Sequence, residues 1–181
     1  MVHTTASNTG SKAADIMRYF LRVLGWRKGG YHAIIERDGT LVRFYDYDQM
    51  EATNGILPDE AGWGLSNLTC IHVAYVGGVS NTNQNEAVCN ITSAQEATLL
   101  SYISEVIARY PWVKVVGHNQ LNRKYCPSFW VPDWLLARNP KLRPRLIFED
   151  VFGIKKAVKS LPHPIGFYSQ AKCPHCGHFL K

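Results

Sequence analysis

The stretch Val113-Lys114-Val115-Val116-Gly117-His118, followed eight residues later by Cys126, decides how this 181-residue chain is interpreted. A short β-branched run is typical of a buried strand, and it predicts that His118 emerges at the end of that strand. In open α/β sheets, ligands gather at strand ends. We therefore expect His118 and Cys126 to lie together at one edge of a sheet.

His118 and Cys126 are residue types that bind zinc. An imidazole and a thiolate supply two of the three protein ligands of a catalytic zinc site, and His3, at the other end of the chain, is a candidate for the third. This set would leave the ion with a net charge of about +1 and an open position, where a water could be acidified and aimed at a carbonyl. The donors thus predict a hydrolase, although a single histidine is more often hydrogen-bonded and a single cysteine more often a small buried apolar group.

Two helices are predicted from the spacing of apolar residues. The first covers residues 11–24 and ends at Gly25. The second opens with the capping box Thr92-Ser93-Ala94-Gln95 and ends at Pro111. The expected buried faces are Ala14, Met17, Phe20, Leu21 and Leu24 in the first helix, and Leu99, Ile103, Val106, Ile107 and Tyr110 in the second.

The remaining strands are predicted from β-branched and aromatic runs. Residues 31–44 contain two such runs joined by Asp38-Gly39, which supplies the positive φ angles of a tight hairpin. Residues 71–76 predict a largely buried strand before Gly77-Gly78. Strands with flanking helices indicate an α/β fold with a mixed central β-sheet, and the zinc site is expected at the strand ends.

The composition fits one domain with a basic C-terminal extension. The chain is 46% hydrophobic, which is enough for one sizeable core. After Pro140 it becomes Lys141-Leu142-Arg143-Pro144-Arg145, so we divide it into a domain at 1–140 and an extension at 141–181, with one short helix around 148–158. The net charge of +6 favours an anionic partner, such as a cell wall, nucleic acid or an acidic membrane, without choosing among them.

The cysteines argue against a disulfide scaffold, because their number is odd and their spacing irregular. They are Cys70, Cys89, Cys126, Cys173 and Cys176. The motif Cys173-Pro174-His175-Cys176-Gly177-His178 is similar to one half of a zinc knuckle. It predicts a second metal site formed by Cys173, Cys176 and His178, completed by His163 or by another chain. The alternative is a disordered tail.

Targeting signals are not evident. No apolar run approaches the roughly 20 residues that span a bilayer, and the first residues do not form a secretory signal. We therefore expect a chain without a membrane span that is made in the cytoplasm and is either kept there or released by another route, with removal of a leader as a further alternative.

Short motifs along the chain resemble, as an ordered set, those of a known protein family. They are Val2-His3-Thr4-Thr5-Ala6, Gly25-Trp26, Gly30-Tyr31-His32, Arg37-Asp38-Gly39-Thr40, Val76-Gly77-Gly78, Thr92-Ser93-Ala94-Gln95, Gly117-His118 and Lys124-Tyr125-Cys126-Pro127-Ser128-Phe129. In this order and at these spacings, the set resembles the type-2 N-acetylmuramoyl-L-alanine amidases, which include phage amidase endolysins and peptidoglycan recognition proteins. The resemblance covers residues 2–138, and its strength lies in the ordered set rather than in any single motif.

The resemblance implies a site and a substrate. His3, His118 and Cys126 would hold Zn²⁺. Lys124 would help to stabilise the oxyanion, and Tyr31 would position the water or pass a proton to the leaving amine. The substrate would be the amide between the lactyl group of N-acetylmuramic acid and the first L-alanine of the peptidoglycan stem peptide. The enzyme would be a bacteriolytic endolysin or a cell-wall remodelling enzyme, acting on the wall or in the periplasm after release or export.

The chain also departs from the family pattern. Members often carry a histidine in a Gly-x-His segment before the buried strand, whereas this chain has Glu51-Ala52-Thr53-Asn54-Gly55. Candidate substrate-binding residues are Asn54, Trp63 and Asn67, with an aromatic that seals the core edge as the alternative for Trp63. His72 stands where a small residue is common, and we interpret it as a packed or hydrogen-bonded residue rather than a fourth ligand.

Two alternatives stay open. The first is a non-catalytic peptidoglycan-binding module, against which the intact Cys126 argues, since loss of this ligand marks the non-hydrolytic branch of the family that the chain resembles. The second is a basic regulatory protein that binds nucleic acid or a polymerase through residues 141–181. We rank nucleic acid below peptidoglycan as the partner, and the sequence does not indicate an oligomeric state.

Overall fold

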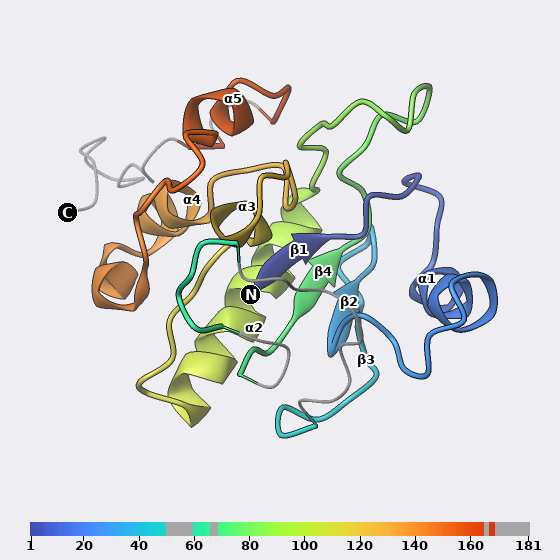
Figure 1. Cartoon of the computed structure of the whole chain (residues 1–181), viewed down its shortest axis with the longest axis horizontal. Coiled ribbons are helices and arrows are strands. Elements are labelled where there is room, and N and C mark those ends of the chain that lie inside the picture. Colours follow the sequence, from blue (N-terminus) through green and yellow to red (C-terminus); the bar gives the residue numbers. More distant parts are fainter. Residues whose placement is uncertain (50–59, 66–68, 165–166, 169–181) are drawn as a thin grey trace.

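A four-stranded mixed sheet forms the centre of the protein (Figure 1). The computed structural model describes residues 1–49, 60–65, 69–164 and 167–168. The strands are β1 (Val2–Thr4), β2 (Ala33–Ile35), β3 (Leu41–Arg43) and β4 (Val73–Tyr75), in the order β1-β4-β2-β3. Both β1 and β2 run parallel to β4, and β3 is antiparallel to β2. The predicted mixed sheet is confirmed.

The β2–β3 hairpin turns at Asp38-Gly39, as predicted. Gly39 has a φ of 89°, which disfavours other residues. A Cβ at this position would also lie 3.0 Å from the backbone oxygen of Ala94. The Glu36 N–H donates to the Thr40 oxygen at 2.9 Å and closes the turn, and the Asp38 carboxylate accepts a hydrogen bond from the Thr40 N–H at 2.9 Å within it. The turn thereby brings β2 up to the start of the following long helix.

That helix, α2 (Ser93–Arg109), begins at the predicted capping box. Thr92 Oγ1 accepts from the Gln95 N–H at 3.1 Å, and Gln95 Oε1 accepts from the Thr92 N–H at 3.0 Å. Gln95 Nε2 also donates to the backbone oxygens of Ile35 and Val76, which ties the helix to the sheet. Of the predicted inner face, Leu99, Ile103 and Val106 are buried, while Ile107 and Tyr110 are partly buried.

The first predicted helix is present, but its predicted buried face is wrong. It consists of α1 (Ala13–Arg18) and a π-helical turn, η1 (Tyr19–Val23). Ala13 and Ile16 are buried instead. Of the predicted residues, Ala14, Leu21 and Leu24 are exposed and Met17 and Phe20 are partly buried. The inner face is offset by one residue in α1, and the wider π-turn rotates the side chains that follow away from a 3.6-residue stripe.

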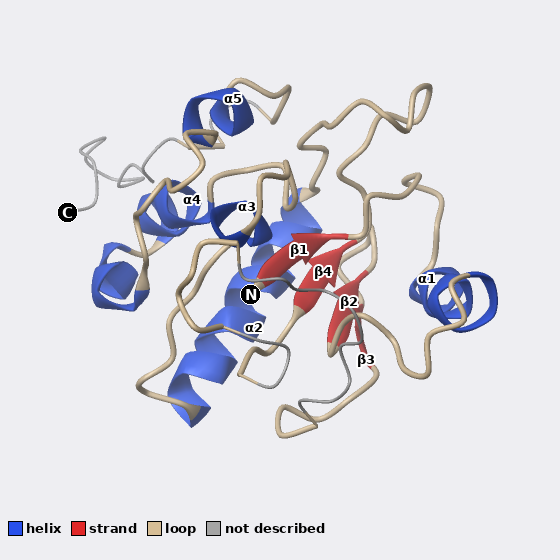
Figure 2. Ribbon diagram, in the orientation of Figure 1, coloured by secondary structure: helices blue, strands red, loops and turns tan. Residues whose placement is uncertain are grey.

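The two faces of the sheet pack against different helices. On one, the α2 face, Val2, Val73 and Tyr75 share a hydrophobic core with Leu99 of α2. On the other, the α1 face, Ile34 and Val76 pack with residues of α1. Figure 2 shows α2 passing behind the strands and α1 lying apart from it across the sheet. Because side chains alternate along a strand, His3 faces away from the core that holds Val2.

The strand predicted over residues 113–116 is not formed as a continuous strand. Val115 makes an isolated parallel bridge with Leu146, and Gly117 makes one with Val2. Each partner pairs with only one residue, so a two-residue ladder does not develop. The Val2 N–H nevertheless donates to the oxygen of Val116 at 2.8 Å, which holds this segment beside β1. It leads directly into α3 (His118–Leu121).

Residues beyond Pro140 pack against the rest of the protein. After α4 (Val131–Arg138) come η3 (Pro140–Arg145), a 3-10 helix, and α5 (Lys155–Lys159), which is shorter than the predicted helix. Leu146 and Phe167 belong to the core of the α2 face. The division into a domain at 1–140 and an extension at 141–181 stays a prediction.

Candidate metal centre

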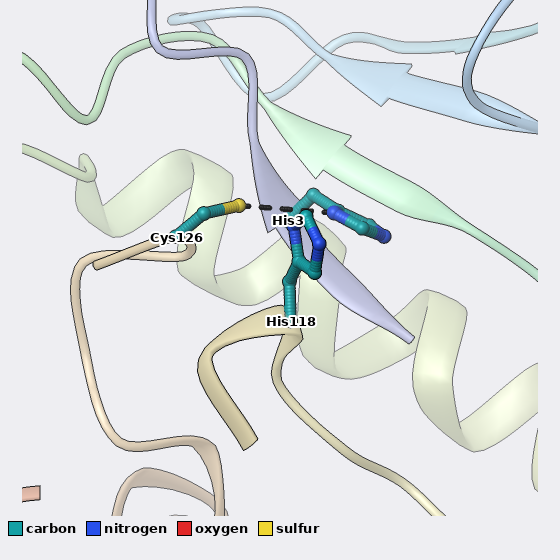
Figure 3. Close-up of side chains that lie close together, drawn as sticks. All are labelled: His3, His118 and Cys126. Atoms are coloured by element: carbon teal, nitrogen blue, oxygen red, sulfur yellow. Dashed lines mark hydrogen bonds between the residues drawn. The ribbon is translucent and has the colours of Figure 1, made fainter. Parts of the chain in front are cut away.

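The three predicted ligands His3, His118 and Cys126 lie together (Figure 3). Their possible ligand atoms all lie within 4.8 Å of one another. Cys126 Sγ is 3.7 Å from His3 Nδ1, and the ring centroids of His3 and His118 are 4.7 Å apart. His3 comes from β1, His118 from the first position of α3, and Cys126 from the loop that follows. Two distant parts of the sequence therefore converge on one point: β1 and the segment that contains His118 and Cys126.

Buried amides fix the position of His118. Gln120 Oε1 accepts from the Gly117 N–H at 3.0 Å, and Asn119 Nδ2 donates to the oxygen of Phe129 at 3.0 Å. A Cβ at Gly117 would lie 2.6 Å from Asn119 Oδ1 and 3.0 Å from Val131 Cγ2. Glycine is thus the residue that lets the chain pass closely enough to deliver His118 beside β1.

The backbone of Thr4 holds Cys126 against the sheet. The Thr4 N–H donates to Cys126 Sγ at 3.3 Å, and Sγ lies 3.7 Å from the Thr4 oxygen. The Tyr75 hydroxyl, buried on the α2 face, donates to the oxygen of Pro127 at 2.8 Å and holds the loop against the sheet. The thiol is therefore fixed by two strands of the sheet, although the loop itself is not part of it.

Burial keeps the two imidazoles neutral. Desolvation lowers the pKa of His3 well below its usual value, and the charge of His118 lowers it further. Desolvation also lowers the pKa of His118 to about 4, with Lys124 acting in the same direction and Asn122 and Glu60 in the opposite one. At neutral pH each ring can offer a nitrogen lone pair to a metal. His118 Nε2 is buried and has no hydrogen-bond partner within the described part of the chain.

The protonation of Cys126 is coupled to metal binding. Desolvation raises the pKa of its thiol to about 12, while the Thr4 N–H and the charge of Lys124 oppose this shift. Without a metal the thiol stays protonated at neutral pH, and an incoming ion must release that proton. Two neutral imidazoles and one thiol that becomes a thiolate fit a zinc ion with three protein ligands and one open position.

Tyr31 lies beside the same cluster, and the charge of Lys124 acts on it. The Tyr31 ring is 5.2 Å from the His3 ring between centroids, and its hydroxyl donates to the Thr4 oxygen at 3.4 Å. Desolvation raises the pKa of Tyr31 far above its usual value, so the phenol stays protonated. Lys124 is exposed, and its charge lowers the pKa values of His3, His118 and Cys126.

Other predicted residues lie elsewhere or are not described. Trp63 lines an apolar cavity of about 420 Å³ together with Ile103 and Val106 of α2, and the three candidate metal ligands do not line it. Its role in substrate binding stays a prediction. Asn54, Asn67, Cys173, Cys176 and His178 lie outside the described residues.

A further histidine contacts the site. His72, next to β4, places Nδ1 at 2.9 Å from Nε2 of His3, and the two rings stack with centroids 5.2 Å apart. Its interpretation as a hydrogen-bonded residue is confirmed. The contact joins residues 69 positions apart, so local sequence patterns do not reveal it. The one signal in the sequence is a histidine where a small residue is common.

The chain is similar to known proteins over most of its length. Residues 1–129 match the family described as N-acetylmuramoyl-L-alanine amidase. The endolysin of Klebsiella phage KP32 is 32% identical over 134 residues, which cover 74% of this chain and 82% of that protein. The Ph2119 endolysin from Thermus scotoductus MAT2119 bacteriophage has a similar fold, with a TM-score of 0.50 and 22% identity over 70% of this chain and 73% of that one. So does Apis mellifera PGRP-SA, with a TM-score of 0.51 and 18% identity over 81% and 82% of the two chains. By its sequence, this chain belongs to the N-acetylmuramoyl-L-alanine amidase family.

Proposed function

We propose that this protein is a zinc-dependent hydrolase that acts as a lysin. Its enzyme class is peptidoglycan amidase, as for the family to which it belongs. The bond cleaved would join the lactyl group of N-acetylmuramic acid to the first L-alanine of the stem peptide. The observation that carries the proposal is the cluster of His3, His118 and Cys126, whose donor atoms lie within 4.8 Å of one another. Such a set fits a catalytic zinc with an open position.

The ligands would be His3 Nδ1, one ring nitrogen of His118 and Cys126 Sγ. When bound, zinc supplies a Lewis acid that polarises the scissile carbonyl and lowers the pKa of a water to about 7. Cys126 would bind as the thiolate, with its proton passing to solvent or buffer. Since both histidines are buried and neutral, solvent would not compete for their nitrogens, and the ion would be held with little rearrangement.

Lys124 would stabilise the negative charge that develops on the carbonyl oxygen. Its side chain is exposed, while its charge already lowers the pKa values of His118 and Cys126. The same field that disfavours a proton on these ligands would favour an oxyanion next to them. Lys124 would therefore contribute more in the transition state than in the bound substrate.

Tyr31 would position the attacking water or pass a proton to the leaving amine. Its hydroxyl donates to the Thr4 oxygen, and the N–H of Thr4 donates to Cys126 Sγ, so one residue of β1 aligns both side chains. Because desolvation raises the pKa of Tyr31, the phenol acts as a neutral donor rather than as a phenolate base.

Peptidoglycan would be the partner, and the cell wall the place of action. The relative from Klebsiella phage KP32 is an endolysin. None of the described helices combines the length and the apolar character that crossing a membrane demands. Asn54, Trp63 and Asn67 stay candidates for contacts with glycan or peptide. Cys173, Cys176 and His178 stay candidates for a second metal site.

The test is mass spectrometry of murein digested by the wild type and by Cys126→Ser, with metal content measured on both proteins. We expect the wild type to carry zinc at the cluster and to release stem peptides while the glycan stays uncut. Cys126→Ser should release none. Zinc-loaded wild type that binds muramyl peptides without cleaving them would instead indicate a recognition module. Binding to nucleic acid that weakens steeply with salt, without murein cleavage, would favour a regulatory protein.

A further inference from the structure

We propose that His72 is a positioning residue that holds His3 in the tautomer and orientation required of a metal ligand. This inference rests on the proposed function, because it takes His3 as a ligand. His3 Nδ1 is turned toward Cys126 Sγ at 3.7 Å, and His3 Nε2 is turned toward His72 Nδ1 at 2.9 Å. The two nitrogens of one ring thus face the metal site and the neighbouring histidine, respectively.

The hydrogen bond determines where the protons lie. A metal ligand needs a lone pair on Nδ1 of His3, so the single proton of the neutral ring must be on Nε2. At 2.9 Å, Nε2–H can donate only if His72 Nδ1 is unprotonated, and His72 then carries its own proton on Nε2. Removing the acceptor would leave His3 free to place its proton on the nitrogen that the metal needs.

His32, the residue before β2, holds His72 in place. The His72 N–H donates to His32 Nδ1 at 3.1 Å, and the His32 N–H donates to the His72 oxygen at 2.9 Å. The rings of His32 and His72 are nearly parallel, with an angle of 10° and centroids 6.0 Å apart. His3 in β1, His72 just before β4 and His32 just before β2 thus form a histidine row across these adjacent strands. The contact to His3 therefore depends on the register of three strands.

The histidine row destabilises the folded protein, and packing alone does not explain why histidines occupy these positions. His72 and His32 are fully buried, and within the described residues their Nε2 atoms have no hydrogen-bond partner. A buried unpaired N–H destabilises the folded state, and an apolar side chain of similar size would avoid this loss. A position that needed only to be filled would favour such an apolar residue. The bond to His3 supplies a reason for an imidazole at position 72.

A neutral acceptor also has a chemical consequence. Metal-bound histidines often donate their second N–H to a carboxylate, which adds a negative charge behind the ligand. His72 orients His3 without adding one. The ion would therefore keep the net charge of about +1 that two neutral imidazoles and one thiolate leave to it, which favours attack on a carbonyl.

Two substitutions of His72 distinguish the effect of its hydrogen bond to His3 from the effect of its packing. His72→Leu removes the acceptor and keeps an apolar side chain, whereas His72→Asn places an amide oxygen near the position of Nδ1. We expect His72→Leu to raise the zinc dissociation constant about 10–100-fold, and His72→Asn to recover most of the wild-type affinity. Competition with a chromophoric chelator measures both. Ile34→Val, on the same face of the sheet but without a contact to His3, is the matched control and should bind zinc like the wild type.

The tautomer itself provides a readout that a packing role would not change. In the metal-free wild type, ¹⁵N NMR should show the proton of His3 on Nε2, and His72→Leu should shift it partly to Nδ1. A wild-type proton on Nδ1, or a folded His72→Leu with wild-type zinc affinity, would overturn the inference. If His72→Leu does not fold, the wild-type spectrum and the affinity of His72→Asn decide. Wild type that binds no zinc at all would overturn the proposed function instead.

Discussion

The two faces of the sheet are built from alternate residues of the same short strands, yet they differ in chemistry. On the α2 face, Val2 and Val73 pack with Leu99 in an apolar core. On the opposite face, the neighbouring residues His3 and His72 bury ring nitrogens. With strands of only three residues, the apolar face must supply the stability that holds the polar face in register. One step along β1 thus separates a residue of the apolar core, Val2, from the candidate metal ligand His3.

Removing a candidate metal ligand should produce the largest effect. The effect should be confined to the face of the sheet that carries His3. Cys126→Ser takes away the thiolate, so we expect the zinc content and the release of stem peptides to be lost together. The free energy of unfolding of the metal-free protein should change little, because no apolar packing is removed. Metal analysis, a murein release assay and denaturant unfolding measure the three quantities. Full activity in a zinc-free Cys126→Ser protein would show that the cluster is not the catalytic site.

The converse substitution lies on the α2 face. Leu99 is fully buried, and Leu99→Ala should lower the free energy of unfolding by about 2–5 kcal/mol through lost burial and the cavity left behind. The zinc affinity of the molecules that stay folded should match the wild type. Denaturant unfolding and a chelator competition on the same sample give both values. A large drop in affinity would mean that the two faces are coupled more tightly than their separate contacts suggest.

Lys124 tests whether the site contains more than its metal ligands. Lys124→Ala should reduce kcat about 10²–10³-fold, as expected for the loss of one oxyanion-stabilising group, with zinc content unchanged. Arg123→Ala is the matched control, because Arg123 is an adjacent exposed cation. Its effect on kcat should be small. Equal losses in the two variants would indicate a general electrostatic attraction to murein rather than a specific role for Lys124.

The last prediction concerns the pH dependence of stability. Desolvation lowers the pKa of His32 to about 4 in the folded protein, while an unfolded histidine titrates near 6.5. Between these values the unfolded state binds the proton and the folded state does not, so stability falls as the pH drops below about 6.5. One such histidine contributes up to about 1.4 kcal/mol per pH unit. His3 and His72 act in the same direction.

Denaturant unfolding of the metal-free protein between pH 7.5 and 5 checks this slope, in buffers free of divalent metal. Leu99→Ala should lower the curve without changing its slope, because it does not alter the histidine row. A free energy of unfolding that stays constant over this range would contradict the neutral, buried state of these rings.

Local sequence signals predicted much of the fold. The hairpin at Asp38-Gly39 and the capping box that opens α2 each depend on residues within a few positions of one another, and both are present. The buried face of the first helix was not predictable in this way, because a π-turn at Tyr19–Val23 changes the angular spacing of the side chains. The run at 113–116 has the composition of a strand, but whether it forms a ladder depends on partners elsewhere in the chain.

The candidate site also has a part that the sequence predicts and a part that it does not predict. His118 and Cys126 stand out as a pair on one loop, His3 is the candidate third ligand, and the family resemblance adds Tyr31 and Lys124. The three ligands and Tyr31 lie around one point, and the charge of Lys124 acts on His118. The contact between His3 and His72 was not predictable, since it arises only when β1 and β4 pair in their register. The register in which the strands pair, rather than the composition of the sequence, decides which side chains surround a candidate ligand.

The most direct measurement is a zinc titration of metal-free protein that records bound zinc and released stem peptide at each step. Cys173→Ser and Cys176→Ser should be combined in the protein used, so that the tail does not contribute a second site. We predict that amidase activity rises in proportion to bound zinc and stops rising at about one equivalent, and that adding Cys126→Ser removes both. Activity before any zinc is added, or full zinc binding without Cys126, would contradict a catalytic zinc held by His3, His118 and Cys126.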